Sequence, residues 1–526
     1  MQQTSDNIHC DLLVVGGGIN GAGIARDAAG RGLSVLLCEK DDLASHTSSA
    51  STKLIHGGLR YLEHYEFSLV RKALIEREVL LRSAPHIMGP LRFVMPHEHG
   101  QRPALLIRAG LLLYDLLAKR ELLPASRGVD LRRHPAGAPL KAGFVRGFEY
   151  SDGWVDDARL VVLNAMDAAE KGATVLTRCR CESAERQAGH WLARLRDAGD
   201  RTITVRARCL VNATGPWATQ FLQQAAHQAS AKSLRLIKGS HIVVPRLFEH
   251  PYAYIFQHAD GRIVFAIPYE HDFTLLGTTD IDYHGSLDQV AIAPDEVDYI
   301  CALANHYFAQ QITPADVVSS YSGVRPLLED ASTSASAVTR DYRLEFDAGP
   351  GQAPLLSVFG GKITTFRKLA EEATDQIASA LGHRQQGWTG NACLPGGDIA
   401  GPQPSNLAVL EFSRYIERLQ HQYSWLPAAL VARYAHAYGS RIEVLLRGRS
   451  LLAQMGEEFA PGLYAAEVEY LADHEWATCG ADILWRRSKL GLHLPGDIEA
   501  RLDAWLAARD TGALPPGMDC QTADRI

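Results

Sequence analysis

Leu12–Glu39 of the chain reads LLVVGGGINGAGIARDAAGRGLSVLLCE. The stretch predicts a β-strand, a glycine turn, a helix and a second strand, with Gly16, Gly18 and Gly21 at the spacing G-x-G-x-x-G. The first glycine permits the tight turn, the second lets a pyrophosphate approach the backbone, and the third lets the helix pack against the strand. Glu39, eighteen positions after Gly21, can accept a hydrogen bond from a ribose hydroxyl. The pattern favours dinucleotide binding over a glycine-rich structural turn.

The composition indicates a large globular protein. The chain has 526 residues, 46% of them apolar and 21% charged, so we expect two or three domains and a sizeable core. The net charge of −7 argues against general binding to nucleic acid, although it leaves room for local basic patches. Because the first expected strand begins almost at the N-terminus, we expect no signal peptide and a cytoplasmic location.

The nine cysteines do not suggest a metal site. Cys179 and Cys181 form the only close pair, and one C-x-C without a second pair is poor evidence for zinc. Asp473, His474 and Glu475 are consecutive, which suits the surface of a helix better than a ligand set. We therefore predict buried or idle thiols in a reducing compartment and no bound metal.

The most apolar run, Ala104–Leu117, reads ALLIRAGLLLYDLL and is too short to span a membrane. On a helix, Arg108, Asp115 and Lys119 form one narrow polar stripe, and the other faces are apolar. Two interpretations fit: a helix half sunk in the core, or a helix lying in a membrane interface. The residues alone favour the first.

A hydroxyl-rich loop, Asp42–Leu62, follows the second strand of the opening unit. Apolar residues alternate there with Lys53, His56 and Arg60, and a glycine pair allows close backbone approach. A solvated loop would not need this mixture, so we expect the segment to line a ligand pocket.

Two later stretches have the same order of elements as the opening unit, a strand followed by a turn of small residues. Val211–Trp217, VNATGPW, ends a strand on a turn of small residues, and Leu355–Lys368 contains a strand, the pair Gly360–Gly361 and a helix start. A flavin enzyme interrupts its cofactor domain in this way, whereas a nicotinamide dehydrogenase usually completes its sheet without such a return. FAD is therefore preferred over NAD as the cofactor.

The expected fold is α/β. A Rossmann-like FAD-binding domain (1–90, 150–235 and 320–392) is interrupted by an α+β substrate domain with a mixed sheet (91–149 and 236–319). The second domain also includes the membrane-contact candidate. The stretch PGGDIAGPQPS after residue 394 reads as a linker, and a C-terminal all-helical domain spans 400–526.

Several cationic and imidazole side chains stand beside glycines or at strand–turn junctions. Arginines and lysines that converge on one ligand indicate an anionic substrate, such as a phosphate or a carboxylate. A single arginine more often forms a surface salt bridge, so the cluster carries this prediction. Its members are His56, Arg60, Tyr61, Lys238, His241, Arg325, Arg340 and Lys362.

Long motifs along the chain resemble the FAD-dependent respiratory glycerol-3-phosphate dehydrogenases. They include GGGINGAG, TSSASTKLIHGGLRYLEHYEF, GFEYSDGWVDDARLV, LVNATGPW, RLIKGSHIVVP, YSGVRPL, TRDY and LLSVFGGKITTFRKLAE. The C-terminal DHEW and LWRRSKLG match as well, so the resemblance covers nearly the whole chain.

The resemblance implies oxidation of sn-glycerol 3-phosphate to dihydroxyacetone phosphate, with electrons passed to ubiquinone or menaquinone. It implies a peripheral protein, often a homodimer, on an anionic membrane surface at the cytoplasmic face of the inner membrane. The apolar helix near residue 110 then becomes a candidate for membrane contact.

The resemblance also assigns site residues. Substrate binding falls to Arg60, Tyr61, Thr278, Arg325, Arg340 and Lys362, and the catalytic group comprises His56, His241 and Arg325. The cofactor contacts are Gly16, Gly18, Ile19, Asn20, Gly21, Glu39, Lys40, Thr47, Ser48, Ser49, Ser51, Lys53, Leu54, Ala213, Thr214, Gly215, Gly360, Gly361, Lys362, Ile363 and Thr364.

A general base must take the proton of the C2 hydroxyl while the C2 hydride leaves. His56 and His241 are both candidates, with a slight preference for His56 because it shares a loop with Arg60. Two rival functions stay open. One is an oxidase of the same fold that passes electrons to oxygen or acts on an amino acid, and the other is a flavin-binding membrane scaffold without turnover.

Overall fold

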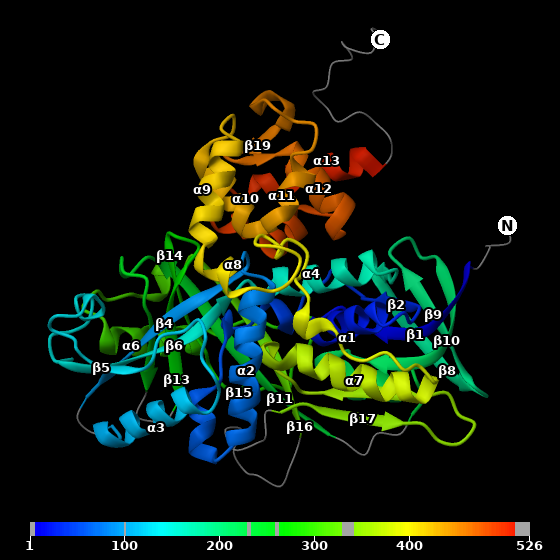
Figure 1. The fold of residues 1–526 in the computed structure, drawn as a ribbon, viewed down its shortest axis with the longest axis horizontal. Coiled ribbons are helices and arrows are strands. Elements are labelled where there is room, and N and C mark those ends of the chain that lie inside the picture. The colour runs from blue at the N-terminus through cyan, green and yellow to red at the C-terminus, as the bar shows by residue number, and fades with distance from the viewer. Residues whose placement is uncertain (1–5, 99–100, 229–232, 258–261, 329–340, 511–526) are drawn as a thin grey trace. The chain divides into compact units, whose positions relative to one another are not determined.

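The computed structural model describes residues 6–98, 101–228, 233–257, 262–328 and 341–510 (Figure 1). The chain divides into two compact units, Met1–Tyr415 and Ile416–Ile526. The larger unit holds two sheets, and the smaller unit is mainly helical. Among the described residues, the helices are too short or too polar to cross a membrane.

The first sheet carries the nucleotide-binding topology that the glycine pattern predicts. Four parallel pairings join β7, β2, β1, β10 and β18 in that order, β17 adds an antiparallel edge, and the β8–β9 hairpin extends from β10. Leu12 pairs with Val35 on one side and Cys209 on the other. The strands are β1 (Asp6–Val15), β2 (Val35–Cys38), β7 (Thr174–Leu176), β8 (Cys179–Gln187), β9 (His190–Asp197), β10 (Thr202–Asn212), β17 (Arg343–Asp347) and β18 (Leu355–Phe359).

Helix α1 (Ile19–Gly30) packs against both α4 (Asp157–Glu170) and α7 (Phe366–Leu381), and Figure 1 shows α1 and α7 side by side. A Cβ on Gly23 would lie 2.8 Å from the Phe366 ring, so this glycine permits the close contact of the two helices. A short helix, α5 (Ala218–Gln224), follows β10. The return strand β18 thus joins the sheet about 340 residues after β1 and is followed by α7, as the sequence predicts.

The second sheet is mixed and mostly antiparallel, in the order β15-β11-β14-β13-β12-β4-β6-β3, with β16 paired to β11 and β5 paired to β6. Its strands are β3 (Leu54–Ile55), β4 (Met88–His97), β5 (Arg127–Asp130), β6 (Arg146–Val155), β11 (Leu234–Pro245), β12 (Ala253–Gln257), β13 (Ile263–Tyr269), β14 (Phe273–Gly277), β15 (Ile281–Asp282) and β16 (Ser319–Leu328).

Helices α2 (Phe67–Ser83) and α6 (Pro294–Tyr307) also belong to the larger unit. α6 packs against β11, β13 and β14 over an apolar cluster that includes Tyr254, Phe256 and Tyr307. Strands β6 and β16 lie in this second sheet, although the sequence groups most of their residues with the FAD-binding segments. The expected domain limits remain a prediction.

Helix α3 (Ala104–Leu116) has the opposite orientation to the one that its residues alone favour. Arg108 and Asp115 of the polar stripe face the protein: Asp115 accepts hydrogen bonds from the backbone and hydroxyl of Ser126 at 2.8 and 2.6 Å, and Arg108 donates to the same hydroxyl at 2.7 Å. Lys119, beyond the end of the helix, is 84% exposed. Most of the leucines face outward, with Leu105 85% exposed, whereas Leu111 is buried. One side of the helix is buried, with Leu111, Tyr114 and Asp115, but the expectation that the apolar faces pack inside and the polar stripe faces solvent is wrong. The exposed leucines are Leu105, Leu106, Leu112, Leu113 and Leu116.

The smaller unit is helical with one short pair of strands. The buried carboxylate of Glu467 accepts hydrogen bonds from the guanidinium of Arg433 at 2.7 Å and from the hydroxyl of Tyr438 at 2.6 Å. Asp473–Glu475 ends a helix, as the sequence predicts, although Glu475 is buried. α8 (Asn406–Leu410) belongs to the larger unit, and α9 (Phe412–Gln422) crosses the boundary after Tyr415. The helices and strands that follow are α10 (Ala428–Tyr438), α11 (Ile442–Leu445), β19 (Glu458–Ala460), β20 (Leu463–Tyr464), α12 (Ala465–Glu475), a π-helical turn (Asp482–Arg487) and α13 (Asp497–Asp510).

Replacing Gly21 with alanine should destabilise the fold by about 3 kcal/mol or more. Its Cβ would lie 1.9 Å from the carbonyl oxygen of Gly16, a backbone atom that cannot move without opening the glycine turn. Gly110→Ala is the matched control, since no atom lies within 4 Å of its Cβ position on α3. It should stabilise the protein by about 0.5–1 kcal/mol. Thermal unfolding of both variants decides the matter, and equal melting temperatures would contradict this account.

Candidate functional site

The glycine turn between β1 and α1 forms the first wall of the site. Gly16 (φ +114°) packs against the end of β10, where its Cβ would lie 2.5 Å from the carbonyl oxygen of Ala213. Gly18 caps α1, and the amide of Ile19 donates to Ser48 Oγ at 3.0 Å. A Cβ on Gly18 would meet only that hydroxyl within 4 Å. The backbone therefore stays open to a ligand at the positive end of the helix.

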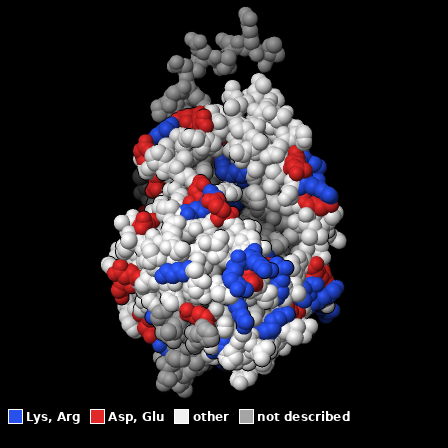
Figure 2. Space-filling model, turned by 90° about the vertical axis from the view of Figure 1, so that its left-hand side faces the viewer, with Lys and Arg blue, Asp and Glu red and all other residues white. Residues whose placement is uncertain are grey.

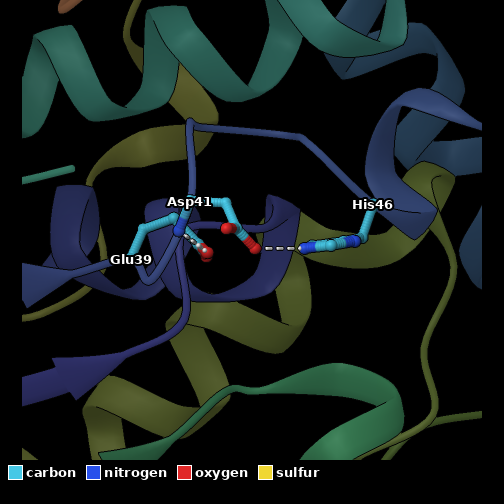
Figure 3. A group of neighbouring side chains, drawn as sticks. All are labelled: Glu39, Asp41 and His46. Carbon is cyan, nitrogen blue, oxygen red and sulfur yellow. Dashed lines mark hydrogen bonds and ion pairs between the residues drawn. The ribbon is translucent and has the colours of Figure 1, made fainter. Parts of the chain in front are cut away.

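Glu39 directly follows β2 and holds the loop beside the glycine turn (Figure 3). Its two oxygens accept hydrogen bonds from the amides of Gly17 at 2.6 Å and Asp41 at 2.9 Å. His46 Nε2 lies 2.7 Å from Asp41 Oδ2. Burial raises the pKa of Glu39, and the two amide donors oppose that shift.

Ligand atoms of Glu39, Asp41 and His46 lie within 4.8 Å of one another, a spacing that a metal ion could use. Both oxygens of Glu39 already accept from backbone amides, and its place after the second strand suits a ribose hydroxyl. We therefore interpret Glu39 as a nucleotide contact.

One cavity of about 720 Å³ joins the glycine turn to the second sheet. This volume is within the range of cofactor pockets. Of the residues predicted to contact the cofactor, those that line the cavity are Gly16, Gly18, Ile19, Asn20, Glu39, Lys40, Thr47, Ser48, Ser51, Leu54, Ala213, Thr214, Gly215, Gly360, Gly361, Lys362, Ile363 and Thr364. The predicted substrate and catalytic residues that line it are His56, Arg60, Tyr61, His241, Thr278, Arg325 and Lys362.

Asn20, near the start of α1, has an unused polar atom at the cavity. Its Nδ2 donates to the carbonyl of Gly360 at 3.3 Å. Its buried Oδ1 has no hydrogen-bond partner among the described residues. A buried acceptor of this kind is costly unless a ligand donates to it. The open glycine backbone, the acceptor Glu39 and this orphaned oxygen together fit a dinucleotide.

Lys53, predicted to contact the cofactor, does not line the cavity. Its ammonium is buried against Asp157 at 2.8 Å, donates to the carbonyl of Ser49, and lies 4.6 Å from the centre of the Tyr321 ring. The Lys53–Asp157 ion pair fixes the hydroxyl-rich loop to α4. Ser51 adds a second contact to the same carboxylate, since its hydroxyl donates to Asp157 at 2.7 Å. Gly21 and Ser49 likewise lie outside the cavity lining.

The predicted cationic side chains at the cavity come from three separate parts of the chain: Arg60 from the 3₁₀ turn after β3, Arg325 from β16 and Lys362 from the segment after β18. Arg325 on β16 donates to the carbonyl of Thr279 and to Asp280, both at 3.2 Å, and is about one-third exposed. Lys362, after β18, has its ammonium 3.5 Å from the centre of the Tyr61 ring. Lys238 was expected in this group but pairs with Glu296 at 2.6 Å and does not line the cavity. Arg340 lies outside the described residues.

The two histidines at the cavity differ in their surroundings. His56 belongs to the loop after β3, where its amide donates to Thr364 Oγ1 at 3.2 Å. His241 on β11 is 2% exposed, stacks on Tyr321 and has Nε2 3.0 Å from Thr52 Oγ1. Burial lowers the pKa of His241 well below its usual value, and the charges of Lys53 and Arg325 lower it further. His241 is therefore neutral at neutral pH.

Two residues that shape the cavity, Trp217 and Gly239, are not identified by the sequence. Trp217 lies under the ammonium of Lys40, 4.2 Å from the ring centre, and contacts His46 edge to face. Gly239 leaves room for two polar groups, because its Cβ would lie 2.6 Å from Thr278 Oγ1 and 2.9 Å from Arg325 Nη2. Trp217 lies two residues after the Ala-Thr-Gly turn, with Pro216 between them, and this position is the one sequence signal that could mark it.

A family model described as FAD-dependent oxidoreductase matches residues 11–367 of the chain. The chain belongs to this family. Its cofactor is FAD, in agreement with the cavity described above.

Known proteins resemble the chain over almost its full length. A glycerol-3-phosphate dehydrogenase of Pseudomonas aeruginosa is 55% identical over 94% of each chain. A D-erythritol 1-phosphate dehydrogenase of Brucella abortus is 50% identical over 94% of this chain and 97% of its own. The solved glycerol-3-phosphate dehydrogenase of Bacillus halodurans, complexed with FAD, superimposes with a TM-score of 0.73 at 28% identity, covering 96% of this chain and 88% of its own. The resemblance expected from the motifs is confirmed.

Proposed function

We propose that the protein oxidises sn-glycerol 3-phosphate to dihydroxyacetone phosphate. The observation that carries this proposal is a single cavity that joins the FAD-binding glycine turn to a group of cationic side chains. Bound FAD supplies the acceptor for the C2 hydride. The name of the 55% identical relative supports the same substrate.

Arg325, Lys362 and Arg60 are suited to bind the phosphate. Each lines the cavity, and they come from β16, the segment after β18, and the 3₁₀ turn Leu59–His64. A guanidinium can give two parallel hydrogen bonds to phosphate oxygens, and an ammonium adds a compact charge. Because Asp280 already orients Arg325, little conformational entropy is lost on binding.

His56 is our choice for the base that takes the C2 hydroxyl proton. It lines the cavity, and its backbone is fixed by the hydrogen bond to Thr364. His241 is less suitable because its depressed pKa makes the imidazole a weak proton acceptor. The Nε2 of His241 is also engaged by Thr52 at 3.0 Å. We assign His241 the role of a neutral side chain that lines the cavity and forms hydrogen bonds there.

The outward leucines of α3 support contact with a membrane and electron transfer to a quinone in it. At the C-terminal end of α3, a shallow groove is lined by Arg71, Lys119 and Arg120 together with Leu116 and Leu123. Figure 2 shows that Lys and Arg side chains gather on the side of the molecule where β5 and α3 lie in Figure 1. Apolar side chains beside cations suit an anionic lipid surface. In the same proposal, the protein lies on the cytoplasmic face of the inner membrane and forms a homodimer.

Arg325→Ala should lower kcat/KM for sn-glycerol 3-phosphate by about ten- to a hundredfold, since one charge-assisted hydrogen bond contributes about 1.5–3 kcal/mol. Steady-state kinetics with a soluble quinone measures this. Arg235→Ala is the control: Arg235 pairs with Asp282 at 2.6 Å and does not line the cavity. Unchanged kcat/KM for Arg325→Ala would exclude Arg325 as a phosphate ligand.

His56→Asn should slow flavin reduction at saturating substrate by about a hundredfold or more, because a general base contributes about 10²–10⁴ to the rate. His241→Asn should slow it by less than about tenfold and retain FAD. Anaerobic single-turnover absorbance separates this step from reoxidation. A greater loss for His241→Asn would reverse the assignment.

Leu105→Asp with Leu116→Asp should abolish binding to vesicles of anionic phospholipid. Flavin reduction by substrate and reoxidation by a soluble quinone should stay unchanged, because neither step needs a membrane. Only the rate of reoxidation by a long-chain quinone in the vesicles should fall. Leu410→Asp on α8 is the control, since Leu410 (69%) is as exposed as Leu116 (71%). Undiminished vesicle binding by the double variant would refute the role of α3, and rapid peroxide formation would favour an oxidase.

A further inference from the structure

A buried hydrogen-bond network lies behind the loop that carries His56. Tyr114, on the inward face of α3, accepts a hydrogen bond from the amide of Gly57 at 2.9 Å and donates to Asp152 Oδ1 at 2.8 Å. Arg77, from α2, donates to the same carboxylate at 2.7 Å. Tyr114, Asp152 and Arg77 are each 3% exposed or less. Three separate elements, α2, α3 and β6, therefore meet at one amide of the His56 loop.

The network determines where each hydrogen points. Tyr114 has one hydroxyl hydrogen, and Asp152 takes it, so the oxygen presents a lone pair to the amide of Gly57. Burial raises the pKa of Tyr114 well above its usual value, which keeps the phenol protonated. Burial also raises the pKa of Asp152, and the nearby guanidinium of Arg77 opposes that shift. Tyr114 thus remains a donor to the carboxylate and an acceptor for Gly57.

The amide of Gly57 donates to Tyr114 Oη at 2.9 Å and, over the longer distance of 3.3 Å, to Asp152 Oδ1. Close packing restricts Gly57 as well. A Cβ at this position would lie 2.5 Å from the hydroxyl of Tyr114 and 2.5 Å from Leu74 Cδ2. On its N-terminal side, His56 is fixed by the amide hydrogen bond to Thr364 at 3.2 Å. The loop is therefore held at two consecutive amides, by different parts of the chain, just before Arg60.

We propose that Tyr114 is a positioning residue for the reaction: by holding the Gly57 amide it aligns His56 with the substrate. The inference rests on the proposed oxidation of sn-glycerol 3-phosphate with His56 as base. Tyr114 does not line the cavity, so it acts only through the loop. It lies on the face of α3 opposite to the exposed leucines.

A purely structural role would be different. In that case Tyr114 would only anchor α3. Removing another buried side chain of the helix would then slow flavin reduction as much as removing the Tyr114 hydroxyl. Leu111, fully buried on the same helix, tests this alternative, since it packs α3 without taking part in the network.

The experiment compares FAD-loaded wild type, Tyr114→Phe and Leu111→Ala. Flavin reduction by sn-glycerol 3-phosphate is followed anaerobically by stopped-flow absorbance, together with the melting temperature. Tyr114→Phe keeps the ring and removes only the hydroxyl. It should reduce the limiting rate by about ten- to a hundredfold, because a small misplacement of a catalytic group has an effect of this size. The half-saturating substrate concentration should change less than about threefold, because Arg325 and Lys362 belong to other elements.

Leu111→Ala should lower the melting temperature but reduce flavin at the wild-type limiting rate. A wild-type rate for Tyr114→Phe would overturn the inference, and so would an equal loss of rate in Leu111→Ala. If wild-type protein itself fails to reduce its flavin with this substrate, the proposed function fails instead.

Discussion

Gly16 packs so closely against the end of β10 that no side chain fits at this position. Gly16 approaches the carbonyl of Ala213, and Gly21 approaches the carbonyl of Gly16. Both contacts fix α1 relative to the sheet, and α1 in turn packs against α4 and α7. The open backbone at Gly18, and with it the FAD site, depends on this close packing.

The second constraint is the burial of charge around the hydroxyl-rich loop. Lys53 and Asp157 anchor the middle of the loop, and Asp152 with Arg77 and Tyr114 anchors its C-terminal part at Gly57. A buried pair contributes little net stability but is costly to break, so such pairs specify one loop conformation. The loop can therefore present its cavity-lining side chains in one arrangement.

Much of the fold could be predicted because glycine spacing and strand patterns are local signals. The opening βαβ unit, the return strand β18 and the C-terminal helices are confirmed. The membership of β6 and β16 in the second sheet could not be predicted, since strand pairing depends on partners far along the chain. The outward face of α3 was mispredicted from its residues because polar side chains usually face solvent, whereas here Asp115 and Arg108 bind Ser126 inside.

The candidate site shows the same division between local and distant information. The glycines and Glu39 were identifiable from spacing, and most of the predicted residues line one cavity. The sequence could not tell that Lys53 pairs with Asp157, about 100 residues away, or that Lys238 pairs with Glu296. It gave no sign of Tyr114, because nothing in an apolar helix marks one hydroxyl as the partner of a distant glycine amide.

Anaerobic titration of the FAD-loaded protein with sn-glycerol 3-phosphate, followed at the flavin absorbance, tests the central claim most directly. The account predicts rapid bleaching of the flavin band, faster than with D-erythritol 1-phosphate, and recovery of the band when a quinone is added. A flavin that keeps its absorbance with sn-glycerol 3-phosphate, or that D-erythritol 1-phosphate reduces faster, would contradict it.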